Sequence, residues 1–356
     1  MKRTTQFVLV FVILAFGVFL VASVAAQGEM TGVTTAILNL RAGPGRDQPD
    51  IGSLPNNASI VLEGRNEAGD WVLVHVPDSA IRGWIAAAYI NPQNGARISD
   101  LPVTTELMAA VQYSVMDRLR MTPIVPSVTG RARAIYEQGL ALGNHPNRFS
   151  KVGDCQNIPE FFLGGFDRGE YALGEHANLQ ATIDYFAGSF ERNSMAVSPG
   201  FNVYAVLDPA WSVSPCQNGG SPQECEYRLW RPSFVIVSLE ITSGITVEGY
   251  EAALREILDF WIGNGVVPIV GTKADNREGD WSFNAVIARV AWEYDVPLWN
   301  FLMAAQPLPN YGLEDGFHLT FAPNDFSNPN NMQSAWPWRN LTALQALDVM
   351  RRGLGL

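Results

Sequence analysis

Short apolar runs alternate with polar turns in the first part of the chain, between residues 31 and 92. Alternation over a few residues is typical of half-buried strands, and the Pro, Asn, Asp and Gly residues between the runs end each strand. The predicted strands are 37–40, 51–52, 60–62, 71–74 and 83–85. Short strands at this spacing predict a small, strongly bent β-barrel.

From residue 149 onward, apolar runs alternate with stretches of helical periodicity. The runs suit buried strands, and they lie at 149–152, 194–197, 234–239, 266–271 and 298–301. Between the third and fourth runs, and again between the fourth and fifth, apolar residues recur every three or four positions. This order predicts a parallel sheet covered by helices on both faces, with any functional site beyond the carboxyl ends of the strands.

The remaining segments are assigned by composition. Residues 93–126 carry scattered prolines and are predicted to be a linker with one short helix, and residues 127–356 are predicted to form the second domain. Apolar positions at 341–351 predict a helix that packs on the sheet.

The first 26 residues have the pattern of a secretory signal peptide. Lys2 and Arg3 precede an apolar run at 7–22, and small residues follow just before Gln27. An uncleaved membrane anchor is the alternative, because the apolar stretch is almost long enough to span a bilayer. In either case the folded part is predicted to be secreted or extracytoplasmic.

Length and charge narrow the function classes. The 356 residues suffice for two domains, and a hydrophobic fraction of 47% excludes a wholly disordered chain. The formal net charge is −11 and no block of five like charges occurs, so neither nucleic acid nor an anionic membrane surface is an expected partner. No phosphate-binding loop and no metal-ligand spacing is found, so no cofactor and no metal are expected.

The cysteine count becomes informative once export is predicted. The chain has three cysteines, and an odd number outside the cytoplasm leaves one thiol unpaired. Cys216 and Cys225 bracket a turn-rich stretch that returns easily on itself, so they are the predicted disulfide pair. Cys155 is then the free thiol.

Three motifs in the barrel region resemble the bacterial SH3 domain. Leu-Asn-Leu-Arg-Ala-Gly-Pro-Gly at 38–45 resembles its opening motif, Gly-Asp-Trp at 69–71 its middle strand and Gly-Trp-Ile at 83–85 its closing strand. The resemblance implies an SH3-like domain over residues 31–92 that binds cell-wall peptide or glycan. Trp71 and Trp84 are candidates to line its ligand groove, and the alternative is that both fill the core.

Residues able to carry chemistry follow the predicted strands of the second unit. Cys155 ends Gly-Asp-Cys after the first strand, where the N-terminus of a following helix would stabilise a thiolate. Asp315 and His318 lie past the fifth strand, three residues apart, so the carboxylate can orient an imidazole that takes a proton. Gly200 follows the second strand, where backbone N–H groups can face a ligand. The polar residues after the fourth strand are candidate substrate contacts: Lys273, Asp275 and Asn276.

These motifs resemble the blocks of the SGNH (GDSL-type) hydrolases, a family of esterases, lipases and acyl hydrolases with a three-layer α/β/α fold. Gly-Asp-Cys at 153–155 resembles the first block, which normally ends in a nucleophilic Ser, and Asp315 and His318 match the Asp-x-x-His of the last block. The resemblance implies that Cys155 attacks, that His318 is base and then acid, and that Asp315 orients His318. It also implies an oxyanion hole formed by Cys155, Gly200 and, where the family has Asn, Thr242.

Two departures from the family pattern leave three functions open. Cys155 replaces Ser, and the third block, usually Gly-x-Asn-Asp, reads Glu-Ile-Thr-Ser at 240–243. Loss of one oxyanion donor typically costs about 10²–10³ in rate. The leading interpretation is an exported ester hydrolase with a module that binds the cell envelope. The alternatives are a catalytically inactive binding protein of the same fold and an acyltransferase that uses the same site. A nucleophilic Cys155 is predicted to have a pKa below about 8.5.

Overall fold

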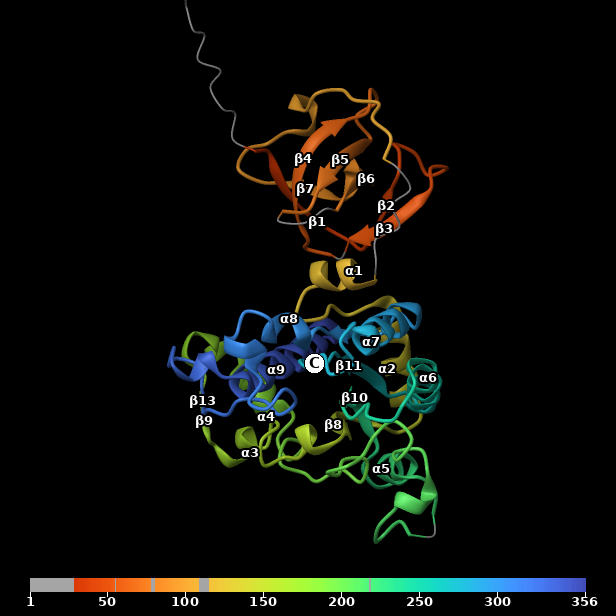
Figure 1. The fold of residues 1–356 in the computed structure, drawn as a ribbon, viewed down its shortest axis with the longest axis vertical. Coiled ribbons are helices and arrows are strands. Elements are labelled where there is room, and N and C mark those ends of the chain that lie inside the picture. The colour runs from red at the N-terminus through yellow and green to blue at the C-terminus, as the bar shows by residue number, and fades with distance from the viewer. Residues whose placement is uncertain (1–28, 55, 78–80, 109–114, 218) are drawn as a thin grey trace, which may run out of the picture.

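The computed structural model describes residues 29–54, 56–77, 81–108, 115–217 and 219–356, and the predicted signal peptide at 1–26 lies outside them. Within these ranges no helix is both long and apolar enough to cross a bilayer. The described chain forms two units along the long axis of the molecule, a small β unit and a larger α/β unit (Figure 1).

The N-terminal unit is a strongly bent, seven-stranded antiparallel sheet (Figure 1). Inward and outward positions alternate along it, so that Leu38 and Leu40 are buried while Asn39 between them is exposed. The strands pair in the order β3-β2-β6-β5-β4-β1-β7. Their bounds are β1 (Thr31–Thr34), β2 (Leu38–Arg41), β3 (Asp50–Leu54), β4 (Ser59–Arg65), β5 (Trp71–His75), β6 (Arg82–Ala86) and β7 (Ile90–Pro92). The predicted all-β, SH3-like unit is confirmed.

Part of the predicted linker belongs to this unit. Between residues 98 and 108 the chain runs back along the barrel, and Leu101 is buried in the barrel core. The backbone of Arg65 exchanges hydrogen bonds with Pro102 (2.9 Å) and Thr104 (2.8 Å). The proline-rich composition indicated a linker, but these residues pair with the end of β4, beyond the residues of β4 that β1 pairs with.

The second unit is built on a parallel sheet of four strands in the order β12-β11-β10-β8. The strands are β8 (His145–Gly153), β10 (Pro232–Ser238), β11 (Val267–Gly271) and β12 (Leu298–Trp299). All residues of β10 and β11 are buried, because helices cover both faces. The predicted three-layer α/β architecture is confirmed.

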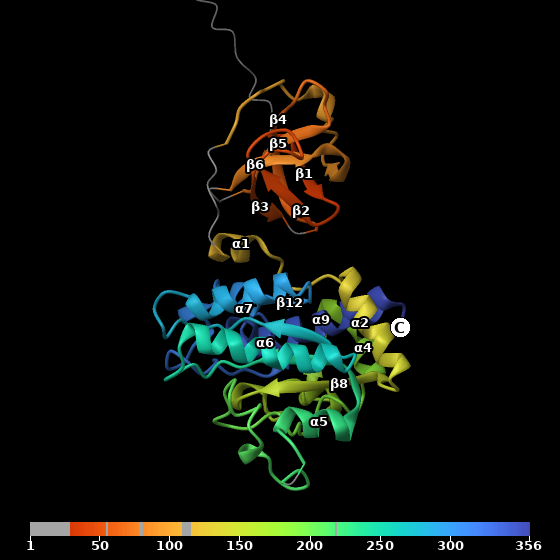
Figure 2. The ribbon, with the colours of Figure 1, turned by 90° about the vertical axis from the view of Figure 1, so that its right-hand side faces the viewer.

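Helices α6 and α7 lie on one face of the sheet, with α4 and α9 on the other (Figure 2). The helices are α1 (Val115–Met121), α2 (Gly130–Ala141), α3 (Gly165–Arg168), α4 (Gln180–Tyr185), α5 (Pro222–Trp230), α6 (Val247–Gly263), α7 (Ser282–Glu293), α8 (Phe301–Ala305) and α9 (Ala335–Leu354). A two-stranded parallel pair, β9 (Tyr171–Ala172) with β13 (Asn324–Asp325), lies beside α9. The helix predicted at 341–351 is the centre of α9, which packs on the sheet as expected.

The strand predicted at 194–197 is reduced to a single bridge, between Gly153 and Val197. Side chains accept hydrogen bonds from backbone N–H groups that would otherwise pair with a neighbouring strand. The N–H of Met195 donates to Glu226 (2.8 Å), and that of Ala196 donates to the Ser194 hydroxyl (3.1 Å). The segment 194–197 is therefore irregular, because polar side chains compete with strand pairing for its backbone N–H groups.

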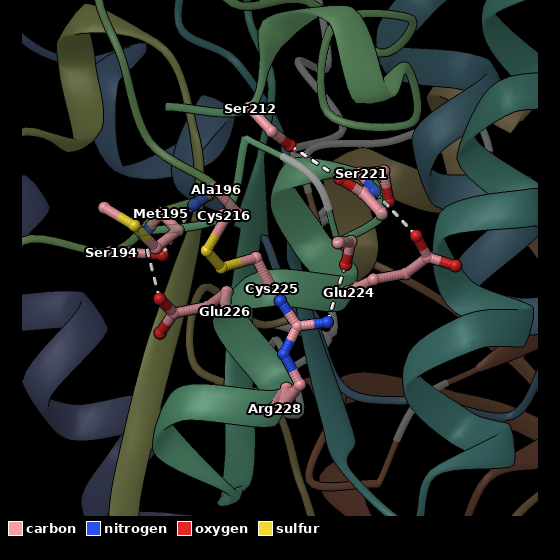
Figure 3. Close-up of a disulfide and its surroundings, with 12 residues drawn as sticks. Ser194, Met195, Ala196, Ser212, Cys216, Ser221, Glu224, Cys225, Glu226 and Arg228 are labelled. Carbon is pink, nitrogen blue, oxygen red and sulfur yellow. Dashed lines mark hydrogen bonds between the residues drawn. A yellow bond between two sulfur atoms is a disulfide. The ribbon is translucent and has the colours of Figure 1, made fainter. Parts of the chain in front are cut away.

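The disulfide joins Cys216 to Cys225, the pair that the sequence indicated, with Cα atoms 5.9 Å apart (Figure 3). Cys225 lies on α5, which begins with a capping box in which Ser221 and Glu224 satisfy each other's backbone N–H. The bridge fastens the loop before α5 to the helix itself. Cys155 is free.

Candidate functional site

Asp154 connects two of the loops at the carboxyl end of the sheet. Its side chain is fully buried, and one carboxylate oxygen accepts from the N–H of Gln156 (2.9 Å). The other accepts from the N–H groups of Glu240 (2.6 Å) and Ile241 (3.1 Å). The Cys155 turn is thereby held against the loop that follows β10, which carries Thr242.

Gly153 allows this turn to be tight. A Cβ atom there would lie 2.0 Å from the amide nitrogen of Asn157, which donates to the carbonyl of Ser238 (2.7 Å). Any side chain at residue 153 would break that bond between the two loops. The carbonyl of Gly153 accepts from the N–H of Ser198 (3.4 Å), which brings the loop of Gly200 to the same place.

Cys155 is half-buried in an anionic environment. Burial, together with the nearby carboxylates of Asp154 and Glu240, raises the pKa of its thiol to about 11, and burial contributes most. The residues after it form only one turn of 3-10 helix, Cys155–Asn157. The sequence-based expectation of a pKa below 8.5 is wrong, because it assumed a following helix and did not foresee the buried Glu240.

Asp315 and His318 form a pair in the loop after α8. Nδ1 of His318 lies 2.7 Å from the Asp315 carboxylate, which also accepts from the backbone N–H groups of Phe317 (3.0 Å) and His318 (2.8 Å). These three donors hold the pKa of Asp315 well below its usual range, the His318 side chain contributing most. A charged Asp315 favours the tautomer with the proton on Nδ1, which leaves Nε2 of His318 free to accept a proton.

Gln156 connects this pair to the cysteine turn. Its amide nitrogen donates to the carbonyl of Phe317 (3.1 Å) and to the carboxylate of Glu240 (3.2 Å). The residue next to Cys155 is thus bonded to the residue next to His318. The structure brings the two candidate motifs to one end of the sheet, although 160 positions separate them in the chain.

The candidate oxyanion donors surround the same turn. Gly200 has a φ of +87°, a conformation that favours glycine, and a Cβ atom placed on it would meet no other atom within 4 Å. Within the described residues, the backbone N–H groups of Cys155 and Gly200 donate to no protein acceptor. Thr242, one residue after Ile241, is partly exposed and carries a hydroxyl where the family has an amide.

A buried charge pair lies beneath the site, and the sequence did not reveal it. Arg339 of α9 is fully buried and donates to Glu240 (2.6 Å) and to Ser238 (2.8 Å). Burial raises the pKa of Glu240 to about 7, and Arg339 opposes this shift. The rings of four aromatic residues enclose the Arg339 guanidinium: Phe162, Trp299, Phe301 and Trp336. Arg339 precedes the helix predicted at 341–351, and no local signal in the sequence distinguished it.

The polar residues after β11 bond mainly to one another and to their own loop. Lys273 is fully buried and its ammonium lies 2.8 Å from Asp275 and 2.7 Å from Glu278. Asn276 accepts from the N–H of Trp281 (2.8 Å) and so closes its own loop. The charges of Lys273 and Asp275 thus neutralise each other inside the protein, whereas Asn276 is partly exposed. The assignment of Lys273, Asp275 and Asn276 as substrate contacts stays a prediction.

The two tryptophans of the barrel differ in exposure. Trp84 is completely buried and its indole N–H donates to the carbonyl of Glu106 (2.8 Å). Trp84 therefore lies beneath the segment that carries Glu106, outside the apolar core of the barrel, and has no exposed surface in this structure. Trp71 is partly exposed and stays a candidate for ligand contact.

No cluster of metal ligands occurs in the described part of the chain. His75 is instead paired with Glu63 of the same barrel, with 2.7 Å between Nδ1 and the carboxylate.

Comparison with known proteins bears on both units. Residues 36–91 match the family model of the bacterial SH3 domain. Among solved structures, the chain is similar to a GDSL-like lipase from Bacteroides thetaiotaomicron at 15% identity and a TM-score of 0.33, over 61% of this chain and 97% of that one. A comparison with curated proteins gave no match. Residues 36–91 of the N-terminal unit thus match a bacterial SH3 domain, and the second unit is an α/β domain built on a parallel sheet.

Proposed function

We propose that this chain is an extracytoplasmic acyl-ester hydrolase that uses Cys155 as nucleophile and its bacterial SH3 domain to bind cell-envelope glycan or peptide. The observation that carries the proposal is the oriented Asp315–His318 pair, joined through Phe317 and Gln156 to the turn of Cys155. A base with a fixed tautomer beside a nucleophile is the arrangement that acyl transfer requires.

The raised pKa of Cys155 decides how the reaction starts. A thiol with a pKa of about 11 is not a thiolate at neutral pH, so its proton must leave as the bond to the substrate forms. His318 Nε2 takes that proton while Sγ attacks the acyl carbon. The same proton then goes to the departing alcohol as the C–O bond breaks, and a thioester remains on Cys155.

Water completes the cycle through the same groups. His318 takes a proton from water as the oxygen attacks the thioester, and returns it to Sγ as the C–S bond breaks. The backbone N–H groups of Cys155 and Gly200 are the donors to the oxyanion, with the Thr242 hydroxyl as third. The Thr242 hydroxyl extends less far toward the oxyanion than the Asn amide of the family would, so turnover should be slow.

Hydrolysis of p-nitrophenyl acetate by the full chain tests the proposal. Turnover above the buffer rate is expected, with loss of at least about a hundredfold in His318→Ala and a smaller loss in Asp315→Asn, since the base remains but its tautomer is no longer fixed. His145→Ala serves as the control, because this histidine lies at the opposite end of β8. No turnover, or turnover that survives His318→Ala, would favour a non-catalytic binding protein.

The anionic surroundings of Cys155 favour that second candidate function. Asp154 and Glu240 oppose a thiolate, as expected of a site that binds an ester or acyl group without cleaving it. Binding of an ester without turnover would support this alternative.

A further inference from the structure

A cavity of about 530 Å³ lies between the loops that carry the candidate nucleophile and base. Phe161, in the loop after the Cys155 turn, forms one part of its wall. Phe321, three residues after His318, forms another. A ligand in this cavity would therefore lie next to both loops of the site.

Exposed aromatic rings form one wall. Phe321 is 64% exposed and Phe161 36%, and their ring centroids are 6.1 Å apart in an edge-to-face arrangement. Phe161 stacks on the buried Trp336 (5.6 Å between centroids), which anchors it to α9. Two exposed apolar rings at a cavity form an apolar surface that gains free energy when a ligand covers it.

The opposite wall is acidic. Arg168 is already occupied, because its Nε donates to Glu170 (2.8 Å) and its Nη1 lies 3.5 Å from Glu191. Two further polar side chains, Glu160 and Asn193, form no side-chain hydrogen bond within the described residues. Three carboxylates against one guanidinium repel an anionic ligand, while Glu160 and Asn193 remain free to bond to hydroxyl groups.

We infer that this cavity binds an uncharged sugar ring, so that the ester acted on is an acylated neutral glycan; the second clause rests on the proposed function. The C–H face of a pyranose packs on Phe161 and Phe321, and its hydroxyls donate to Glu160 and accept from the Asn193 amide. Phosphorylated sugars, uronic acids and free fatty acids are excluded by the three carboxylates.

Calorimetric titration tests binding apart from chemistry. The full chain carrying Cys155→Ala, which has no nucleophile, is titrated with cellotetraose and with chitotetraose. At least one of them is expected to bind. Phe321→Ala in the same background is expected to weaken that binding about tenfold and Phe321→Trp to retain it. Leu229→Ala on α5, which removes a similarly exposed apolar side chain, is the matched control. An oligogalacturonate of the same length is expected not to bind at low salt.

Three outcomes would overturn the inference. One is that neither neutral probe binds. Another is that Phe161→Ala and Phe321→Ala bind as tightly as their parent. The third is measured in the chain with Cys155 intact, where p-nitrophenyl octanoate is compared with p-nitrophenyl acetate. If Phe321→Ala abolishes a preference for the octanoate while glycan binding is unchanged, the cavity is an acyl-chain site. Since binding is measured without the nucleophile, an inactive enzyme would leave the result interpretable.

Discussion

At the scale of single residues, the chemistry depends on charges placed around Cys155. Burial and two carboxylates, those of Asp154 and Glu240, raise the pKa of its thiol. Asp154 cannot be removed without releasing the loop after β10, because it accepts from two N–H groups there. The residue that holds the site together therefore also opposes a thiolate, which makes proton removal by His318 central to reactivity.

Labelling with iodoacetamide measures this directly. The rate at Cys155 is expected to rise about tenfold per pH unit between pH 8 and 10, with no plateau in that range, because the thiolate fraction keeps increasing up to a pKa of about 11. Glu240→Gln should increase the rate at pH 8, since a negative charge is lost. A plateau below pH 8.5 would contradict the electrostatics described here.

Order and spacing in the sequence identify Cys155, Asp315 and His318 as candidate site residues, and their catalytic roles stay a prediction. Burial could not be predicted for Lys273 and Trp84, because a polar residue after a strand and an aromatic in a small barrel look alike in sequence whether buried or exposed. Only the fold determines which carboxylate neutralises Lys273 or that Trp84 is covered.

At the scale of secondary-structure elements, β8 carries an unusual buried cation. Lys151 is fully buried and donates to the carbonyl of Phe190 (2.8 Å), and burial lowers its pKa to about 7. In the unfolded chain the pKa would be near 10.5. Between these values the unfolded state binds a proton that the folded state does not, so the free energy of unfolding should rise with pH from about 7 to 10.5.

Lys151→Met is expected to remove that rise. Urea unfolding of the parent chain should show a higher free energy at pH 9 than at pH 7, and the variant should show a much smaller difference. Lys2 and Lys273 are the other lysines of the chain, and Lys273 is paired with Asp275. An unchanged pH dependence in Lys151→Met would show that Lys151 is charged in the folded protein.

The regular elements were largely predictable, because strands and helices express their periodicity in sequence. The four strands of the sheet and the five predicted strands of the barrel were located within a few residues. The segment 194–197 was not, since its backbone bonds go to Ser194 and Glu226. Partners as distant as Glu226 leave no trace in a local pattern.

At the scale of the whole molecule, α1 bridges the two units. Arg118 donates to the Ser53 hydroxyl of β3 (2.8 Å), and its guanidinium lies 4.2 Å from the ring centroid of Trp292 on α7. A cavity of about 600 Å³ lies beside these contacts and is lined by residues of both units. The SH3 domain thus contacts the α/β domain away from Cys155, at the opposite edge of the sheet.

Arg118→Ala is expected to loosen this arrangement. Small-angle scattering should show a larger radius of gyration than the parent chain, because a hydrogen bond and a cation–π contact between the units are lost. Arg120→Ala on the same helix is the control, since the ion pair that Arg120 forms among the described residues is with Asp117 of its own helix. Equal scattering from parent and Arg118→Ala would mean that other contacts hold the units together.

The central claim is that Cys155 forms a covalent acyl intermediate with His318 as the base. Mass spectrometry of the full chain, quenched in acid after mixing with p-nitrophenyl acetate, tests it most directly. The account predicts one acetyl group on the peptide that contains Cys155, formed at least about a hundredfold more slowly in His318→Ala and absent from Cys155→Ala. No acetyl group at Cys155 while p-nitrophenol is released, or equal acetylation in His318→Ala, would contradict it.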